Sequence, residues 1–160
     1  MKKLLTAITL LCFSVGADAQ LTDRFKAFLK VTDPNELQYL YTHQSPDCPF
    51  TSQEAANVIE GVIKRSRIRT ALGIGRNNAI YLNIESSCIE DNTTSGRVLG
   101  YSVFFDINFG DGVMLYAKPY GNLLGGGVSS SRQFFLNSLQ DYVENAVTDF
   151  VEVNFLSDPN

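Results

Sequence analysis

The single histidine of this chain lies in a short stretch that also holds a hydroxyl, a carboxylate and a thiol. His43 is followed by Ser45, Asp47 and Cys48, and these residue types act as base, nucleophile and orienting group in hydrolases. Catalytic partners must converge in space, and near neighbours in one proline-bearing loop rarely do so. We therefore expect His43 to be a solvated loop residue without a catalytic role. A small exported hydrolase is the alternative.

Metal binding and acid–base catalysis lack an adequate set of residues. A zinc site uses three or four histidine, cysteine or carboxylate ligands, and this chain offers one histidine and two cysteines that we expect to be paired. Glu85 and Asp106 are expected on the same polar sheet face in neighbouring strands, where ordinary surface placement explains both. We predict no metal, no cofactor and no catalytic residue.

A glycine- and serine-rich run, residues 125–131, directly precedes Arg132 and a predicted helix start. Exposed backbone amides, a helix N-terminus and an arginine together favour a phosphate or carboxylate. The run lacks the Gly-Lys-Ser/Thr ending of a phosphate loop, and such a run is equally a flexible connection. Arg132 is therefore a candidate anion contact, and a small-anion or lipid carrier is a further alternative function.

Five basic residues gather near the end of another predicted helix. They are Lys64, Arg65, Arg67, Arg69 and Arg76. Positive charge there complements the negative end of the helix dipole, which favours a solvated helix end. The alternative is a contact surface for anionic headgroups or an acidic protein.

The N-terminus has the three parts of a secretory signal peptide. Lys2 and Lys3 precede an apolar run at residues 4–15, and Ala17 and Ala19 occupy the positions that signal peptidase recognises. We therefore predict a signal peptide over residues 1–19. The apolar run is well short of the roughly 20 residues that a membrane-spanning helix needs. We expect no transmembrane segment in the mature chain.

Composition and cysteine count limit the classes of partner. Removal of residues 1–19 changes 13 basic and 17 acidic residues to 11 and 16, a net charge near −5, which argues against nucleic acid as a partner. Cys12 lies inside the apolar run, too early for a lipid anchor. Cys48 and Cys88 remain, and in an oxidising compartment an isolated pair is most simply a disulfide.

Three segments have helical patterns. Apolar residues recur at helical spacing over residues 21–29. Thr51 and Glu54 have the spacing of a capping box that begins a second helix. Residues 130–150 form the longest predicted helix, with one broad apolar stripe. The pattern at residues 37–41 fits either a short helix or an extended segment.

The hydrophobic period changes from 3.6 to 2 in the second half of the chain. Residues 80–85 and 101–109 alternate between apolar and polar side chains, which indicates two strands. Gly110-Asp111-Gly112 is typical of a tight hairpin. We predict a third strand at residues 113–120 and a flexible connection at residues 121–131.

These patterns predict a two-layer α+β fold. Consecutive strands with short loops favour an antiparallel meander, and its apolar face must be covered by another layer. We expect one domain, residues 20–160, in which a three-stranded antiparallel meander packs against helices that include a long C-terminal helix. Phe104 is the one aromatic residue on the polar face of its strand, and we expect a neighbouring element to cover it partly.

The functional expectation follows from the export signal and from the lack of a catalytic set. We predict an exported, non-enzymatic binding or interaction protein of the bacterial cell envelope, located in the periplasm or the medium. Its expected partner is another envelope or extracellular protein. The oligomeric state is left open.

Overall fold

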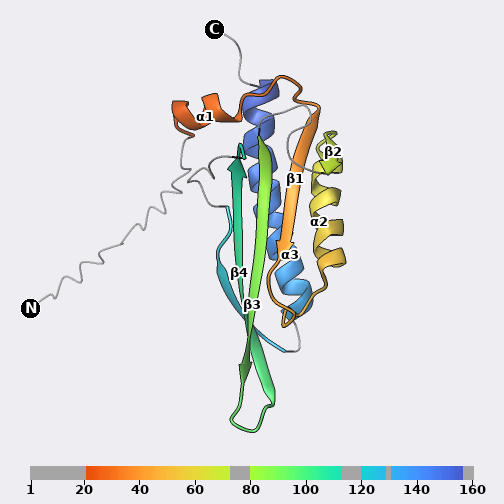
Figure 1. Ribbon diagram of the computed structural model, residues 1–160, viewed down its shortest axis with the longest axis vertical. Coiled ribbons are helices and arrows are strands. Elements are labelled where there is room, and N and C mark those ends of the chain that lie inside the picture. The colour runs from red at the N-terminus through yellow and green to blue at the C-terminus, as the bar shows by residue number, and fades with distance from the viewer. Residues whose placement is uncertain (1–20, 73–79, 113–119, 129–130, 157–160) are drawn as a thin grey trace, which may run out of the picture.

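The computed structural model describes residues 21–72, 80–112, 120–128 and 131–156 (Figure 1). The predicted leader, Arg76, Ser130 and nearly all of the predicted strand at residues 113–120 lie outside these ranges. In chain order the elements are α1 (Asp23–Leu29), β1 (Glu36–His43), α2 (Ser52–Arg65), β2 (Arg69–Leu72), β3 (Tyr81–Asn92), β4 (Val98–Gly110), β5 (Leu123–Gly127), α3 (Ser131–Val151) and the π-helix η1 (Glu152–Leu156).

The strands form one five-stranded sheet in the order β2-β1-β3-β4-β5. β1 pairs in parallel with both β2 and β3, whereas β3, β4 and β5 are antiparallel neighbours. The α+β class is therefore confirmed, and β3, β4 and β5 are antiparallel as predicted for a meander, but a sheet of only three strands is wrong, because the sheet is mixed and has five strands. The parallel pair needs a crossover, and α2 provides it between β1 and β2.

β5 lies in the segment that the sequence predicted to be a flexible connection. Its sequence, Leu-Leu-Gly-Gly-Gly, has low strand propensity, yet it pairs with β4 from Phe104 to Gly100. A β-carbon at Gly100 would lie 2.5 Å from the backbone oxygen of Gly126. Because Gly100 has no side chain, the two backbones can approach closely, and backbone pairing then overrides propensity.

One face of the sheet carries the hydrophobic core. The alternation predicted for β4 is confirmed, since Val103, Phe105, Ile107 and Phe109 are fully buried on this face. Burying each such side chain contributes about 1.5–3 kcal/mol. In Figure 1, α2 and α3 cover this same face from behind. We call the opposite face, on which no helix of the described chain lies, the helix-free face.

The helices that cover the core have the apolar stripes that the sequence predicts, and α2 begins at the predicted capping box. At the start of α2, Thr51 Oγ1 accepts from the Glu54 backbone N–H, and Glu54 Oε2 accepts from the Thr51 backbone N–H at 2.9 Å, which completes the capping box. The α3 stripe is buried at Phe135, Leu139 and Phe150 among others. Within the described residues, no helix combines the length and apolar character needed to cross a membrane.

Candidate functional site

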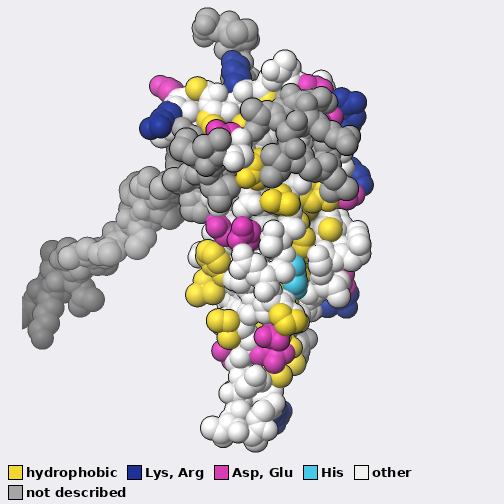
Figure 2. Space-filling model, in the orientation of Figure 1, with side chains coloured by type: hydrophobic (Ala, Val, Ile, Leu, Met, Phe, Trp, Pro, Cys, Tyr) yellow, Lys and Arg dark blue, Asp and Glu magenta, His cyan; other side chains and the backbone are white. Residues whose placement is uncertain are grey.

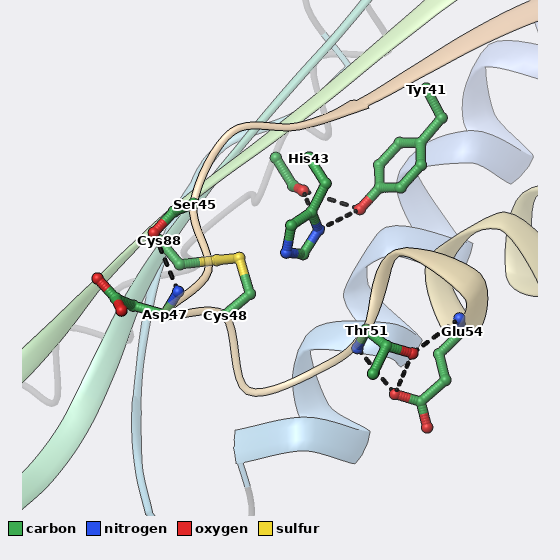
Figure 3. The surroundings of a disulfide bond; sticks show 9 residues. Tyr41, His43, Ser45, Asp47, Cys48, Thr51, Glu54 and Cys88 are labelled. Carbon is green, nitrogen blue, oxygen red and sulfur yellow. Dashed lines mark hydrogen bonds between the residues drawn. A yellow bond between two sulfur atoms is a disulfide. The ribbon is translucent and has the colours of Figure 1, made fainter.

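A disulfide holds the loop between β1 and α2 against the sheet. Cys48 in this loop is bonded to Cys88 on β3, as the cysteine count predicted, with 5.1 Å between the two Cα atoms (Figure 3). The bridge spans 40 residues of sequence. Cys48 therefore has no free thiol with which to act as a nucleophile.

His43 is the last residue of β1 and belongs to a small hydroxyl network. The Tyr41 hydroxyl lies 2.9 Å from His43 Nδ1 and 2.8 Å from Ser86 Oγ, and Ser86 Oγ lies 3.3 Å from the same ring nitrogen. Burial raises the pKa of Tyr41 above its ordinary value, although the Ser86 hydrogen bond opposes this shift. The expectation of a solvated loop histidine is wrong, because this network and the Phe50 ring hold the imidazole half-buried at a strand end.

The other side of the imidazole borders an open depression of about 430 Å³. Its wall includes Phe50, Thr51, Glu54, Arg132 and the Cys48 side of the disulfide. Ser86 cannot serve as a nucleophile here, since its exposed fraction is 0% and its hydroxyl is held by Tyr41.

The Ser45 and Asp47 part of the sequence pattern does not converge on His43. Figure 3 shows both residues on the far side of the disulfide from the imidazole. There the Asp47 backbone N–H donates to Ser45 Oγ at 3.2 Å. The loop therefore stabilises its own turn, and it does not assemble a base with a nucleophile.

Arg132, the candidate anion contact, forms an ion pair with Glu54 across the start of α2. Glu54 is at the same time the carboxylate of the capping box. The Arg132 guanidinium is thus already paired with a carboxylate of the same chain. Gly125 to Gly127 belong to the strand β5 and form no loop around an anion. The structure does not bring Arg132 to the other described basic candidates, which lie at or beyond the opposite end of α2.

Three of the described members of the basic cluster form ion pairs within the chain. Lys64 Nζ lies 2.6 Å from Glu60, Arg65 lies 2.8 Å from Glu144, and Arg69 lies 3.3 Å from Asp33. Arg67 has a positive φ of 60° at the turn from α2 into β2. Exposed pairs of this kind contribute at most about 1 kcal/mol each, but they leave little net charge for an anionic partner.

Among the exposed apolar side chains of the helix-free face, three are neighbours that the sequence did not group together. Phe104 pairs directly with Leu123 on β5, and Ile89 on β3 lies one diagonal step away, opposite Ser102. Their exposed fractions are 45%, 62% and 68% for Phe104, Leu123 and Ile89. We call these three residues the apolar strip. Phe104 is partly covered, as expected, and Leu123 on the neighbouring strand β5 lies beside it.

Carboxylates border the apolar strip on both sides along the strands. Glu85 and Asp106 are directly opposite each other at one end of the strip. Glu85 lies two residues before Ser87, the cross-strand partner of Phe104, and Asp106 lies two residues after Phe104. At the other end, Asp91 lies two residues beyond Ile89. We call these three the acidic rim. The sequence predicted that Glu85 and Asp106 share a polar face, and this is confirmed. Figure 2 shows hydrophobic and acidic side chains together on this face, with Lys and Arg at the margins of the view.

Sequence reasoning missed the apolar strip because two of its members had no strand assignment. Leu123 fell in the predicted flexible connection, and Ile89 lay beyond the predicted end of its strand. The available signal was Phe104, the aromatic exception on a polar face. Scattered exposed apolar residues are normal, but three adjacent ones on a sheet face indicate a contact surface.

Comparisons with known proteins give little further information. No protein-family model matches the chain, and no curated protein matches it. Among solved structures, the chain is similar to a minor lipoprotein from Acinetobacter baumannii, with a TM-score of 0.40 and 13% sequence identity over 71% of this chain and 90% of that chain. At this level of similarity, neither the fold nor the function of that protein is transferred to this chain.

Proposed function

We propose that this protein is an exported, non-enzymatic binding protein of the bacterial cell envelope that contacts its partner through the helix-free face. The observation that carries this proposal is the apolar strip. Phe104, Leu123 and Ile89 are neighbours on three consecutive strands and remain largely exposed. Exposed apolar side chains gain free energy when a partner removes them from water, about 25 cal/mol for each Å² buried.

The disulfide supports export. Structural disulfides persist in oxidising compartments and are rare in the cytosol. Cys48 and Cys88 are the two cysteines that remain if residues 1–19 are removed, and they are bonded to each other. A mass measurement under non-reducing conditions on protein from the periplasm and the medium tests the cleavage after Ala19 and the bridge together.

The packing of the core favours a binding surface over an internal carrier site. A carrier needs a cavity between the sheet and α3, but aromatic rings meet across this interface. The Phe105 and Tyr142 ring centroids are 6.2 Å apart, and the Phe109 and Phe150 rings stack at 6.3 Å. The hydrolase alternative is disfavoured because the Ser86 hydroxyl is fully buried and the exposed Thr51 hydroxyl beside His43 is held in the capping box with Glu54.

Photocrosslinking in living cells tests the proposed surface. A photoreactive amino acid is placed in the full chain at Ile89 or Leu123, and at the matched exposed positions Gln53 on α2 and Asp141 on α3. We expect a discrete crosslinked species from the two strip positions only, and we expect Phe104→Ser to abolish it. Equal crosslinking from all positions, or none from the strip, would contradict the proposal.

A further inference from the structure

We infer that the occupant of the helix-free face is a polypeptide segment of the partner that is apolar in its centre and positively charged on both sides. This inference rests on the proposed function and adds the chemistry of the partner. It uses two features of the face that the apolar strip alone does not require. These are the electrostatic state of the acidic rim and its spacing along the strands.

Among the residues that the structure describes, the carboxylates of the acidic rim have hydrogen bonds to neutral groups only. Glu85 accepts from the Gln44 side-chain amide at 2.7 Å, Asp106 from the Asn108 amide at 2.5 Å, and Asp91 from the Ser102 hydroxyl at 3.4 Å. Amides and hydroxyls stabilise a carboxylate without cancelling its charge. The ion pairs found in the described part of the chain all use other acids, namely Asp33, Glu54, Glu60 and Glu144. The rim therefore presents net negative charge to a partner.

Two rim carboxylates repel each other in the free protein. Glu85 and Asp106 are direct cross-strand neighbours on the same face of the antiparallel pair β3–β4. Like charges in this position destabilise a sheet, whereas opposite charges or apolar pairs stabilise it. A cation placed between them would turn the repulsion into two attractions. This arrangement favours a cationic partner and disfavours a second copy of this acidic chain.

The spacing of the rim defines the length of the partner segment. From Glu85 to Asp91 the strand advances six residues, or about 20 Å at the usual rise per residue. Phe104 and Ile89 lie between these limits. On β5, a β-carbon added at Gly125 or Gly127 would meet no atom within 4 Å, so the surface beside the strip is flat and open. An extended segment with two apolar residues between basic residues fits this pattern.

Peptide binding to the full mature protein tests the inference directly. The probes are a short synthetic peptide with an apolar valine centre flanked by lysines on both sides and a matched peptide with glutamate in place of lysine, and fluorescence anisotropy reports binding. We expect the lysine peptide to bind, the glutamate peptide not to bind, and the affinity for the lysine peptide to fall as salt rises. Glu85→Gln and Asp106→Asn should each weaken binding about threefold, and Phe104→Ser about tenfold or more.

Matched variants keep the outcome specific. Asp141→Asn removes an exposed carboxylate from α3, and Leu156→Ser removes an apolar side chain that is 72% exposed on η1. Neither should change peptide affinity. Circular dichroism and unfolding curves of each variant establish that it is folded. Glu85→Gln in particular should not destabilise the free protein, because it removes a repulsion.

The possible failures are distinguishable. Equal affinity for the lysine and glutamate peptides would overturn the cationic partner and leave the contact surface intact. Self-association of the mature protein in analytical ultracentrifugation, abolished by Phe104→Ser, would show that a second copy occupies the face and would also overturn the inference. Absence of crosslinking from Ile89 and Leu123 would remove the proposed function itself.

Discussion

Reduction of the Cys48–Cys88 bridge should lower the free energy of unfolding by about 2–4 kcal/mol. The bridge closes a loop with a sequence separation of 40 residues. In the chain-entropy model, a cross-link over that length removes about 4 kcal/mol of conformational freedom from the unfolded chain, and measured effects are usually somewhat smaller. The effect is large relative to the roughly 5–15 kcal/mol of total stability that is typical of a domain.

Guanidinium unfolding with and without a thiol-free reductant measures this difference. The chain has no tryptophan, so far-ultraviolet circular dichroism is the appropriate signal. Because the reduced unfolded chain is less compact, its m-value should also rise. The double variant Cys48→Ala/Cys88→Ala serves as the control. It loses the buried Cys88 side chain as well, so it should be no more stable than the reduced protein.

The entropic reasoning fails if reduction lowers stability by less than about 1 kcal/mol with an unchanged m-value. That result would mean that the segment from Cys48 to Cys88 is already constrained in the unfolded chain. If the reduced protein is stable and the alanine variant is not, the loss of stability comes from packing at Cys88 and not from the cross-link. Either outcome separates the cross-link from the side chains that form it.

Two further perturbations test the fold around the core. Gly100→Ala places a β-carbon 2.5 Å from the Gly126 backbone oxygen and should destabilise the protein by about 1–3 kcal/mol in a urea titration. The control Gly125→Ala places its β-carbon in open space and should change stability by less than about 0.5 kcal/mol in the same titration. Burial and the hydrogen bond to Glu60 raise the pKa of Tyr39 from 10.0 to about 12. The Tyr39 hydroxyl therefore stabilises the folded state below about pH 10, and this contribution is lost as the pH rises toward 12. The free energy of unfolding should fall over this range more steeply in the wild type than in Tyr39→Phe. A wild type and variant with parallel curves would show that the Tyr39 hydroxyl does not differ between the folded and unfolded states.

Local sequence signals predicted the elements whose formation depends mainly on their own residues. The Thr51 and Glu54 capping box located the start of α2, because both partners lie within one helical turn. The alternation from Val103 to Phe109 located β4 and its buried face. The cysteine pair predicted the disulfide, since only two cysteines follow the predicted leader.

Three strands depended on partners that lie far away in the sequence. The pattern at residues 37–41 fitted a helix or an extended segment, and pairing with both β2 and β3 makes this segment part of the strand β1. β2 has four residues, too few for a period to be recognised. β5 is rich in glycine, and close approach to Gly100 stabilises it against its own propensity.

The candidate contact surface, too, was predicted from the sequence only in part. Amino-acid type and alternation by themselves determined that Glu85 and Asp106 share a face and that Phe104 is an exception on it. Only the tertiary structure decided that Leu123 and Ile89 lie beside Phe104, and that Arg132 is neutralised by Glu54. The physical reason is that register and ion pairing join residues that are distant along the chain, and no local periodicity specifies such distances.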